Sequence, residues 1–189
     1  LIVGYVEYGA HEEALKYFDQ MWQEGASPNE ITYLYALKAC GNIGALCKFY
    51  EIHMGIVQGE FDTDPYILIG LVDWYAKCGP LSEGLQTFDR LCDKRSIVSW
   101  NALIGGYVHN GLGDEALKCF KEMQDEGISP NPVSFVCALK ACSVIGSVEA
   151  GQEIEDQIRK QGLLQKDISV GTTLVDMYAK CGALEKAQE

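Results

Sequence analysis

The chain has 189 residues, of which 48% are hydrophobic and 22% charged, and its formal net charge is −12. This composition supplies enough apolar material for a core and contains no low-complexity tract, which argues against intrinsic disorder. No apolar run reaches the roughly 18 residues that a membrane-spanning helix needs.

The sequence repeats itself with a period of about 100 residues, which is the signature of a repeat array. Residues 13–16 match residues 115–118 (both Glu-Ala-Leu-Lys), and residues 36–40 match residues 138–142 (both Ala-Leu-Lys-Ala-Cys). The long period divides into three similar repeats. We therefore predict six repeats, in chain order: 1–29, 30–64, 65–96, 97–131, 132–167 and 168–189. The first and last are incomplete, so we expect a fragment of a longer chain, with any targeting segment outside it.

Repeat 97–131 shows the plan that each repeat follows. Its first half keeps a helical apolar rhythm through Val98, Trp100, Leu103, Ile104 and Tyr107. Asn110-Gly111 tolerates the left-handed backbone of a tight reversal and ends this helix. A second amphipathic helix follows, and Gly127 stops it. One such hairpin cannot bury its own apolar face. The predicted fold is therefore all-α: a right-handed α-solenoid of tandem helix-turn-helix hairpins.

The eight cysteines are predicted to be small buried residues in a reducing compartment. Four recur at matching places in the repeats: Cys40 with Cys142, and Cys78 with Cys181. No two cysteines have Cys-x-x-Cys spacing, and the chain has only three histidines. A tetrahedral zinc site is therefore poorly supported, and we expect no metal.

The local motifs resemble those of the pentatricopeptide repeat family, in its plant PLS subclass, rather than the tetratricopeptide pattern. Repeats 1–29 and 97–131 are similar to P motifs, and the second ends in Glu-Gly-Ile-Ser-Pro-Asn. Repeats 30–64 and 132–167 contain Ala-Leu-Lys-Ala-Cys and are similar to L motifs. Repeats 65–96 and 168–189 contain Tyr-Ala-Lys-Cys-Gly and are similar to S motifs. The order P-L-S-P-L-S covers the chain. The resemblance implies sequence-specific binding of single-stranded RNA, one base per repeat.

The resemblance also implies which residues select the base. In this family the fifth and last residues of a repeat contact the base, and an apolar second residue wedges between neighbouring bases. In repeat 97–131 these positions hold Asn101 and Asn131, with Val98 as the wedge. Asparagine offers both a hydrogen-bond donor and an acceptor. The resemblance implies a pyrimidine, with cytosine preferred.

The P-type and S-type repeats apart from 97–131 match this pattern less well. Repeat 65–96 has Ile69 and Ser96 at the base-selecting positions, and the side chain of Ile69 cannot hydrogen-bond a base. Repeat 168–189 keeps Thr172 without its partner, and repeat 1–29 keeps only Asn29. We expect these residues to contribute to RNA binding without a defined base preference.

The L-type repeats have Leu34 with Asp64, and Val136 with Asp167, at the same positions. Editing factors of the resembled subclass recruit an accessory protein through their L motifs. The apolar Leu34 and Val136 fit such a partner better than a base.

The distribution of charge favours RNA on the first helices. RNA binding through phosphate neutralisation calls for a basic surface, and the chain is acidic. The first fourteen positions of the repeats hold equal numbers of acids and bases, so the excess acid lies on second helices and loops. Lys77 and Lys180 stand at the thirteenth position, where the family often contacts phosphate. Their positions fit equally well a solvated lysine near the negative end of the helix dipole, with no contact to RNA.

No enzyme motif is complete in this sequence. His11-Glu12-Glu13 resembles half of the zinc deaminase signature, but the Pro-Cys-x-x-Cys half is absent. We predict no catalytic residue and no cofactor.

The resemblance implies an RNA-binding module of a C-to-U editing or RNA-processing factor in the mitochondrion or chloroplast. A deaminase-like domain would follow residue 189. The alternative is a protein-interaction scaffold that recruits an accessory editing factor through its L-type repeats.

Overall fold

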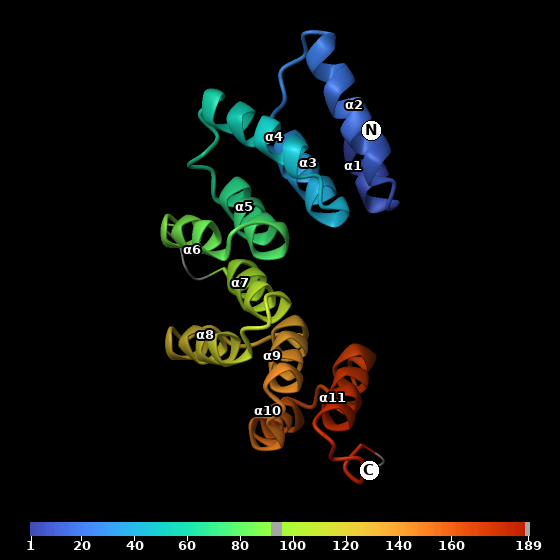
Figure 1. Ribbon diagram of the computed structural model, residues 1–189, viewed down its shortest axis with the longest axis vertical. Coiled ribbons are helices and arrows are strands. Elements are labelled where there is room, and N and C mark those ends of the chain that lie inside the picture. Colours follow the sequence, from blue (N-terminus) through green and yellow to red (C-terminus); the bar gives the residue numbers. More distant parts are fainter. Residues whose placement is uncertain (92–95, 188–189) are drawn as a thin grey trace. The chain divides into compact units, whose positions relative to one another are not determined.

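The computed structural model describes residues 1–91 and 96–187, and within these residues the chain forms eleven α-helices and no strand. The chain packs as two compact units, an N-terminal unit of residues Leu1–Cys92 and a C-terminal unit of residues Asp93–Glu189. Figure 1 labels the helices of both.

The N-terminal unit is organised around one central helix, α3. Its helices are α1 (Ile2–Glu7), α2 (His11–Gln23), α3 (Glu30–Ile43), α4 (Leu46–Gln58), α5 (Pro65–Cys78) and α6 (Leu81–Asp89). Helix α3 packs against α1, α2, α4 and α5. In its core the rings of Phe49 and Trp74 stack with their centroids 3.4 Å apart, and both side chains are buried.

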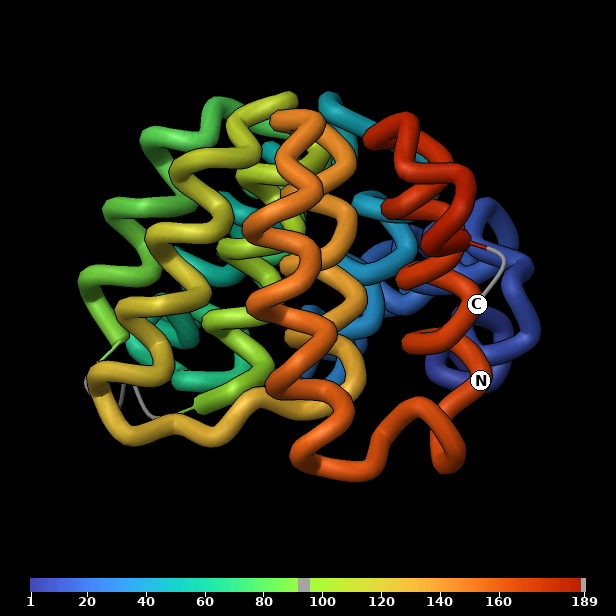
Figure 2. Tube along the Cα trace, turned by 90° about the horizontal axis from the view of Figure 1, so that it is seen from below, coloured from blue at the N-terminus to red at the C-terminus, as the bar shows by residue number. Residues whose placement is uncertain are grey.

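The C-terminal unit has the same plan around α9. Its helices are α7 (Ile97–His109), α8 (Gly113–Asp125), α9 (Pro132–Ile145), α10 (Val148–Lys160) and α11 (Ile168–Lys180). Helix α9 packs against the other four, and Figure 2 shows α9 and α10 (both orange) running side by side. The predicted apolar rhythm of α7 is confirmed for Trp100, Leu103 and Ile104, which are buried, whereas Tyr107 is half-buried and Val98 is exposed.

The helices end where the turn residues predict. Helix α7 ends at His109, and Gly111 follows with a φ of 74°. Helix α8 ends at Asp125, and Gly127 has a φ of 79°. This left-handed backbone is available to glycine without steric strain, because glycine has no Cβ atom.

The prediction that the cysteines are buried is only partly confirmed. Burial raises the pKa of three thiols to about 12, those of Cys40, Cys119 and Cys142. The prediction was wrong for Cys47 and Cys78, which are exposed, while Cys92 lies outside the described residues. Within residues 1–91 and 96–187, no cluster of metal-ligating side chains was found. No helix in these ranges is long and apolar enough to cross a membrane.

Candidate nucleic-acid interface

The structure brings Asn101 and Asn131 into direct contact. Asn101 lies on the first turns of α7, and Asn131 is the N-cap residue of α9. Because α7 and α9 pack against each other, the Nδ2 atom of Asn101 donates to the Oδ1 atom of Asn131 at 3.2 Å. Both side chains remain partly accessible. Two amides separated by thirty positions in the sequence therefore form one polar site.

A buried serine joins the same site. Asn131 Oδ1 accepts a hydrogen bond from the backbone N–H of Ser134 at 3.0 Å, and Ser134 Oγ accepts one from the backbone N–H of Asn131 at 3.2 Å. This capping box satisfies N–H groups that have no acceptor within the helix. The Ser134 hydroxyl also lies 2.7 Å from Asn101 Oδ1, and Ser134 is fully buried. Ser134 was not predicted from the sequence, although a hydroxyl three residues after an N-cap asparagine is a capping-box signal.

Val98, the predicted wedge, is an exposed apolar residue on the first turn of α7, with 58% of its surface accessible. The second positions of three other predicted repeats also hold exposed apolar or aromatic residues: Ile31, Tyr66 and Val133. These three residues were not predicted to contact RNA, although their shared register with Val98 would have identified them. The first turns of α3, α5, α7 and α9 thus present apolar surface to solvent.

The other residues at the predicted base-selecting positions serve mainly local structure. Asn29 caps α3, and its Oδ1 atom accepts from the backbone N–H of Thr32 at 2.9 Å and from its hydroxyl at 2.8 Å. The Thr172 hydroxyl donates to the carbonyl of Ile168 at 2.8 Å. Ile69 is half-buried in the N-terminal unit, whereas Ser96 is the N-cap of α7 in the C-terminal unit.

The corresponding residues of the predicted L-type repeats also serve local structure. Asp64 and Asp167 cap α5 and α11 through backbone N–H groups at 2.9 Å. Leu34 is half-buried between α3 and α5, where a Cβ atom at Gly70 would lie 3.0 Å from its Cδ1 atom. Val136 is likewise half-buried.

The two lysines predicted to contact phosphate each have a carboxylate beside them. The ammonium of Lys77 lies 2.7 Å from Asp73, and that of Lys180 lies 2.8 Å from Asp176. Both pairs join residues four apart on one helix, and both are exposed to solvent. The first helices of the hairpins are α1, α3, α5, α7, α9 and α11. Among the residues that the structure describes, Lys140 is the one lysine of these helices for which no salt bridge is found. The first-helix surface therefore carries little uncompensated positive charge.

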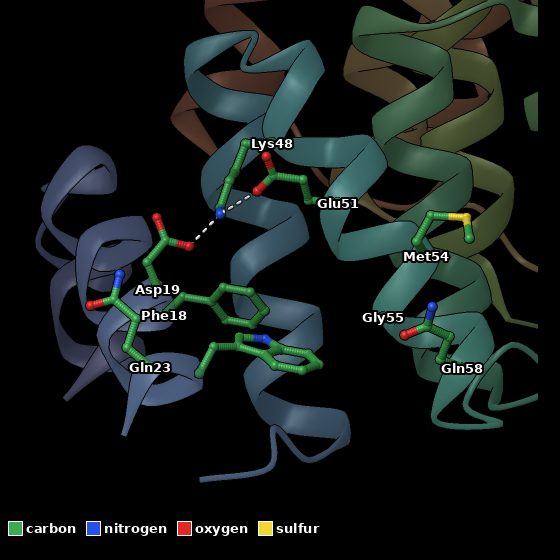
Figure 3. A pocket seen from close by; sticks show the side chains of 9 residues that line it. Phe18, Asp19, Gln23, Lys48, Glu51, Met54, Gly55 and Gln58 are labelled. Carbon is green, nitrogen blue, oxygen red and sulfur yellow. Dashed lines mark hydrogen bonds and ion pairs between the residues drawn. The ribbon is translucent and has the colours of Figure 1, made fainter. Parts of the chain in front are cut away.

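A surface pocket of about 470 Å³ lies elsewhere, between the second helices α2 and α4. Figure 3 shows the Lys48 ammonium between the carboxylates of Asp19 and Glu51, with the Glu51 oxygen at 2.6 Å. The pocket's positive charge is thus already neutralised, and the pocket contains none of the predicted base-selecting residues. Its lining comprises Phe18, Asp19, Trp22, Gln23, Lys48, Glu51, Met54, Gly55 and Gln58.

The packing of first helix against first helix, in the pairs α3–α5 and α7–α9, defines an all-α repeat protein. Comparison with known proteins identifies the family. The PPR repeat family model matches residues 95–143, and the pentatricopeptide repeat domain model matches residues 1–43. The chain belongs to the pentatricopeptide repeat family.

Its curated relatives include several pentatricopeptide repeat-containing proteins of Arabidopsis thaliana. One is 36% identical over 94% of this chain and 25% of its own length. A mitochondrial relative is 35% identical over 100% of this chain and 27% of its own length. A chloroplastic relative is 34% identical over 100% of this chain and 23% of its own length. The chain thus spans about a quarter of the length of these relatives.

Solved structures confirm the fold class. The pentatricopeptide repeat protein PPR10, in complex with an 18-nt psaJ RNA element, matches with a TM-score of 0.78 and 21% identity. That match covers 94% of this chain and 27% of PPR10. The structure of PPR10 from maize matches with a TM-score of 0.61 and 20% identity, over 98% of this chain and 32% of PPR10. The chain is an all-α solenoid of helical hairpins, as its sequence predicts.

Proposed function

We propose that this chain is a sequence-specific single-stranded RNA-binding module, one base per repeat, of an organellar RNA-editing or RNA-processing factor. The observation that carries the proposal is the contact between Asn101 and Asn131 on the first-helix surface. The RNA complex of PPR10 supports RNA as the ligand. Relatives named mitochondrial or chloroplastic support an organellar location.

In the proposed mode of binding, a base stacks on the exposed Val98 side chain and turns its edge toward the two amides. Apolar contact with the base faces does not depend on the base, whereas hydrogen bonds from the amides do. Specificity therefore comes from Asn101 and Asn131, and Val98 and the exposed apolar residues at the same position of other repeats contribute affinity.

Phosphate neutralisation contributes little in this proposal. The net charge is −12, and Lys77 and Lys180 are paired with carboxylates of their own helices. A protein that neutralises few phosphates releases few counterions. We expect weak binding by this chain alone, strongest at low ionic strength.

The test uses short RNAs of one background sequence that differ only in the base at one central position. Cytosine should bind most tightly, followed by uracil. Replacing Asn131 with aspartate (Asn131→Asp) keeps the oxygen that caps α9 but replaces an amide donor with an acceptor. This variant should move the preference toward uracil, whose N3–H is a donor.

The matched control is Asn29→Asp, which makes the same change at the N-cap of α3 in another P-type repeat. It should leave the preference at the varied base unchanged. Binding that ignores the base, or an Asn131→Asp preference equal to the wild-type preference, would refute base selection by this pair.

The accessory-protein alternative remains a prediction without a supporting observation of its own. Leu34 and Val136 are half-buried, and Leu34 contributes to the packing of α3 against α5. Ile31 and Val133 are exposed apolar residues of the predicted L-type repeats, and they lie on the same register as the predicted wedge.

A further inference from the structure

The orientation of the Asn131 amide is dictated by the backbone of α9. The N–H of Ser134 points at the Asn131 side chain at 3.0 Å, and a backbone N–H can only donate. The atom that faces it must therefore be the carbonyl oxygen Oδ1. A rotated amide would place its NH₂ group against another donor and leave a helix-terminal N–H unsatisfied.

The orientation of the Asn101 amide follows from that of Asn131. The group of Asn101 nearest to Asn131 Oδ1 must be a donor, which is Nδ2 at 3.2 Å. The Oδ1 atom of Asn101 then faces the Ser134 hydroxyl at 2.7 Å. That hydroxyl has a single hydrogen. Asn131 Oδ1, 3.0 Å from the same hydroxyl, already accepts from two other groups, so the hydrogen goes to Asn101.

This arrangement turns mainly donors toward a ligand. Asn131 Oδ1 accepts two hydrogen bonds within the site, and Asn101 Oδ1 is directed at the buried Ser134 hydroxyl. Neither hydrogen of Asn131 Nδ2 takes part in the hydrogen bonds within the site. Of the two hydrogens of Asn101 Nδ2, one is bonded to Asn131 and the other is left for a ligand. A base with adjacent acceptors matches such a surface. Cytosine presents N3 and O2 side by side, whereas uracil places its N3–H donor between two acceptors.

We propose that Ser134, the third residue of the following repeat, is a positioning residue that sets the cytosine preference of the Asn101–Asn131 pair by directing the N–H groups of both amides toward the base. This inference rests on the proposed function, because it concerns the base selected by that site. Ser134 itself is fully buried and does not touch the base. Its hydroxyl acts by preventing rotation of the Asn101 amide, which would expose an acceptor to the N3–H of uracil.

The first test compares Ser134→Ala with the wild-type chain in the RNA titration. Loss of the hydroxyl should reduce the ratio of cytosine to uracil affinity by about two- to tenfold, the factor that corresponds to one hydrogen bond. Ser134→Thr restores a hydroxyl and should restore the ratio. Thr32→Ala removes the equivalent hydroxyl beside Asn29 and should leave the ratio unchanged.

The second test needs no RNA. Side-chain amide spectra of the ¹⁵N-labelled chain report the two Nδ2 hydrogens of Asn101, one bonded to Asn131 and one open to solvent. Ser134→Ala should speed exchange of the bonded hydrogen by about two- to tenfold, while Ser134→Thr should keep it slow. Thermal unfolding followed by circular dichroism shows whether each variant is folded.

The outcomes separate the two proposals. A wild-type chain that binds no RNA, or binds it without regard to the base, refutes the proposed function. Asn101 amide signals that are the same in Ser134→Ala and in the wild type refute the role of Ser134, whatever the RNA titration shows. An altered amide with an unchanged cytosine to uracil ratio also overturns it.

Discussion

Replacing Asp73 and Asp176 with asparagine should strengthen RNA binding. Each carboxylate lies beside the ammonium of Lys77 or Lys180, the lysines at the position where the family often contacts phosphate. A phosphate that approaches either lysine meets a negative charge of the same helix. The two pairs are exposed, and an exposed pair four residues apart stabilises a helix by only about 0.3–0.5 kcal/mol. The double variant Asp73→Asn/Asp176→Asn should therefore fold normally.

The size of the effect follows from the geometry of the pairs. The carboxylate oxygens lie 2.7 and 2.8 Å from the two ammonium nitrogens. A phosphate oxygen on the far side of the ammonium would then lie roughly 5.5 Å from the carboxylate, where like charges in water repel by about 0.7 kcal/mol. Removing one carboxylate should raise the affinity roughly threefold, and removing both should raise it about tenfold. Added salt should shrink the gain.

Fluorescence anisotropy with a labelled RNA at low ionic strength measures this gain. The matched control is Glu51→Gln/Glu122→Gln, which removes two exposed carboxylates that pair with lysines of the second helices α4 and α8. Both double variants remove two negative charges from a chain whose net charge is −12. A general effect of charge would raise the affinity of both equally.

A gain confined to Asp73→Asn/Asp176→Asn supports RNA on the first helices. An equal gain in the control, or no gain in either variant, would refute the reasoning, because the two lysines would then have no special relation to phosphate.

Three further predictions concern packing, the wedge and pH. Gly113→Ala should lower the free energy of unfolding in urea by about 1–3 kcal/mol, because its Cβ atom would lie 2.6 Å from Ile145 Cγ2. Gly105→Ala should be neutral or slightly stabilising, because its Cβ atom would lie 3.8 Å from the nearest atom, Cys137 Sγ. Val98→Ser should weaken RNA binding at every base without lowering the melting temperature, since Val98 is exposed; unchanged affinity would contradict its role as the wedge. Burial, and then the charge of Arg90, lower the pKa of His53 below its usual value of about 6.5. The folded state therefore resists protonation, and stability should fall as the pH drops below that value. His53→Gln should reduce this fall, and a melting temperature with the same pH dependence in both proteins would exclude His53 as its cause.

The local structure could be predicted from the sequence because it depends on residues close together in the chain. The apolar rhythm of residues 97–109 and the Asn110-Gly111 turn predicted α7 and its end. The ion pairs of Lys77 and Lys180 were equally predictable, since Asp73 and Asp176 precede them by four residues on a helix. These lysines were instead predicted to be solvated or to contact phosphate.

Contacts between repeats could not be predicted in the same way. Family resemblance paired Asn101 with Asn131, but spacing alone does not place two residues of different hairpins in contact. The matching cysteine motifs likewise did not reveal that Cys78 is exposed while Cys40 is buried. Exposure depends on which neighbouring helix covers a position.

By itself, the sequence determined that this protein is a helical repeat array, because turn residues and apolar periodicity act over a few residues and recur in every repeat. Only the tertiary structure decided how the Asn101–Asn131 site is oriented. The buried Ser134 hydroxyl reaches Asn101 across the contact between α7 and α9. That contact forms when neighbouring hairpins stack to bury apolar faces that neither can cover alone.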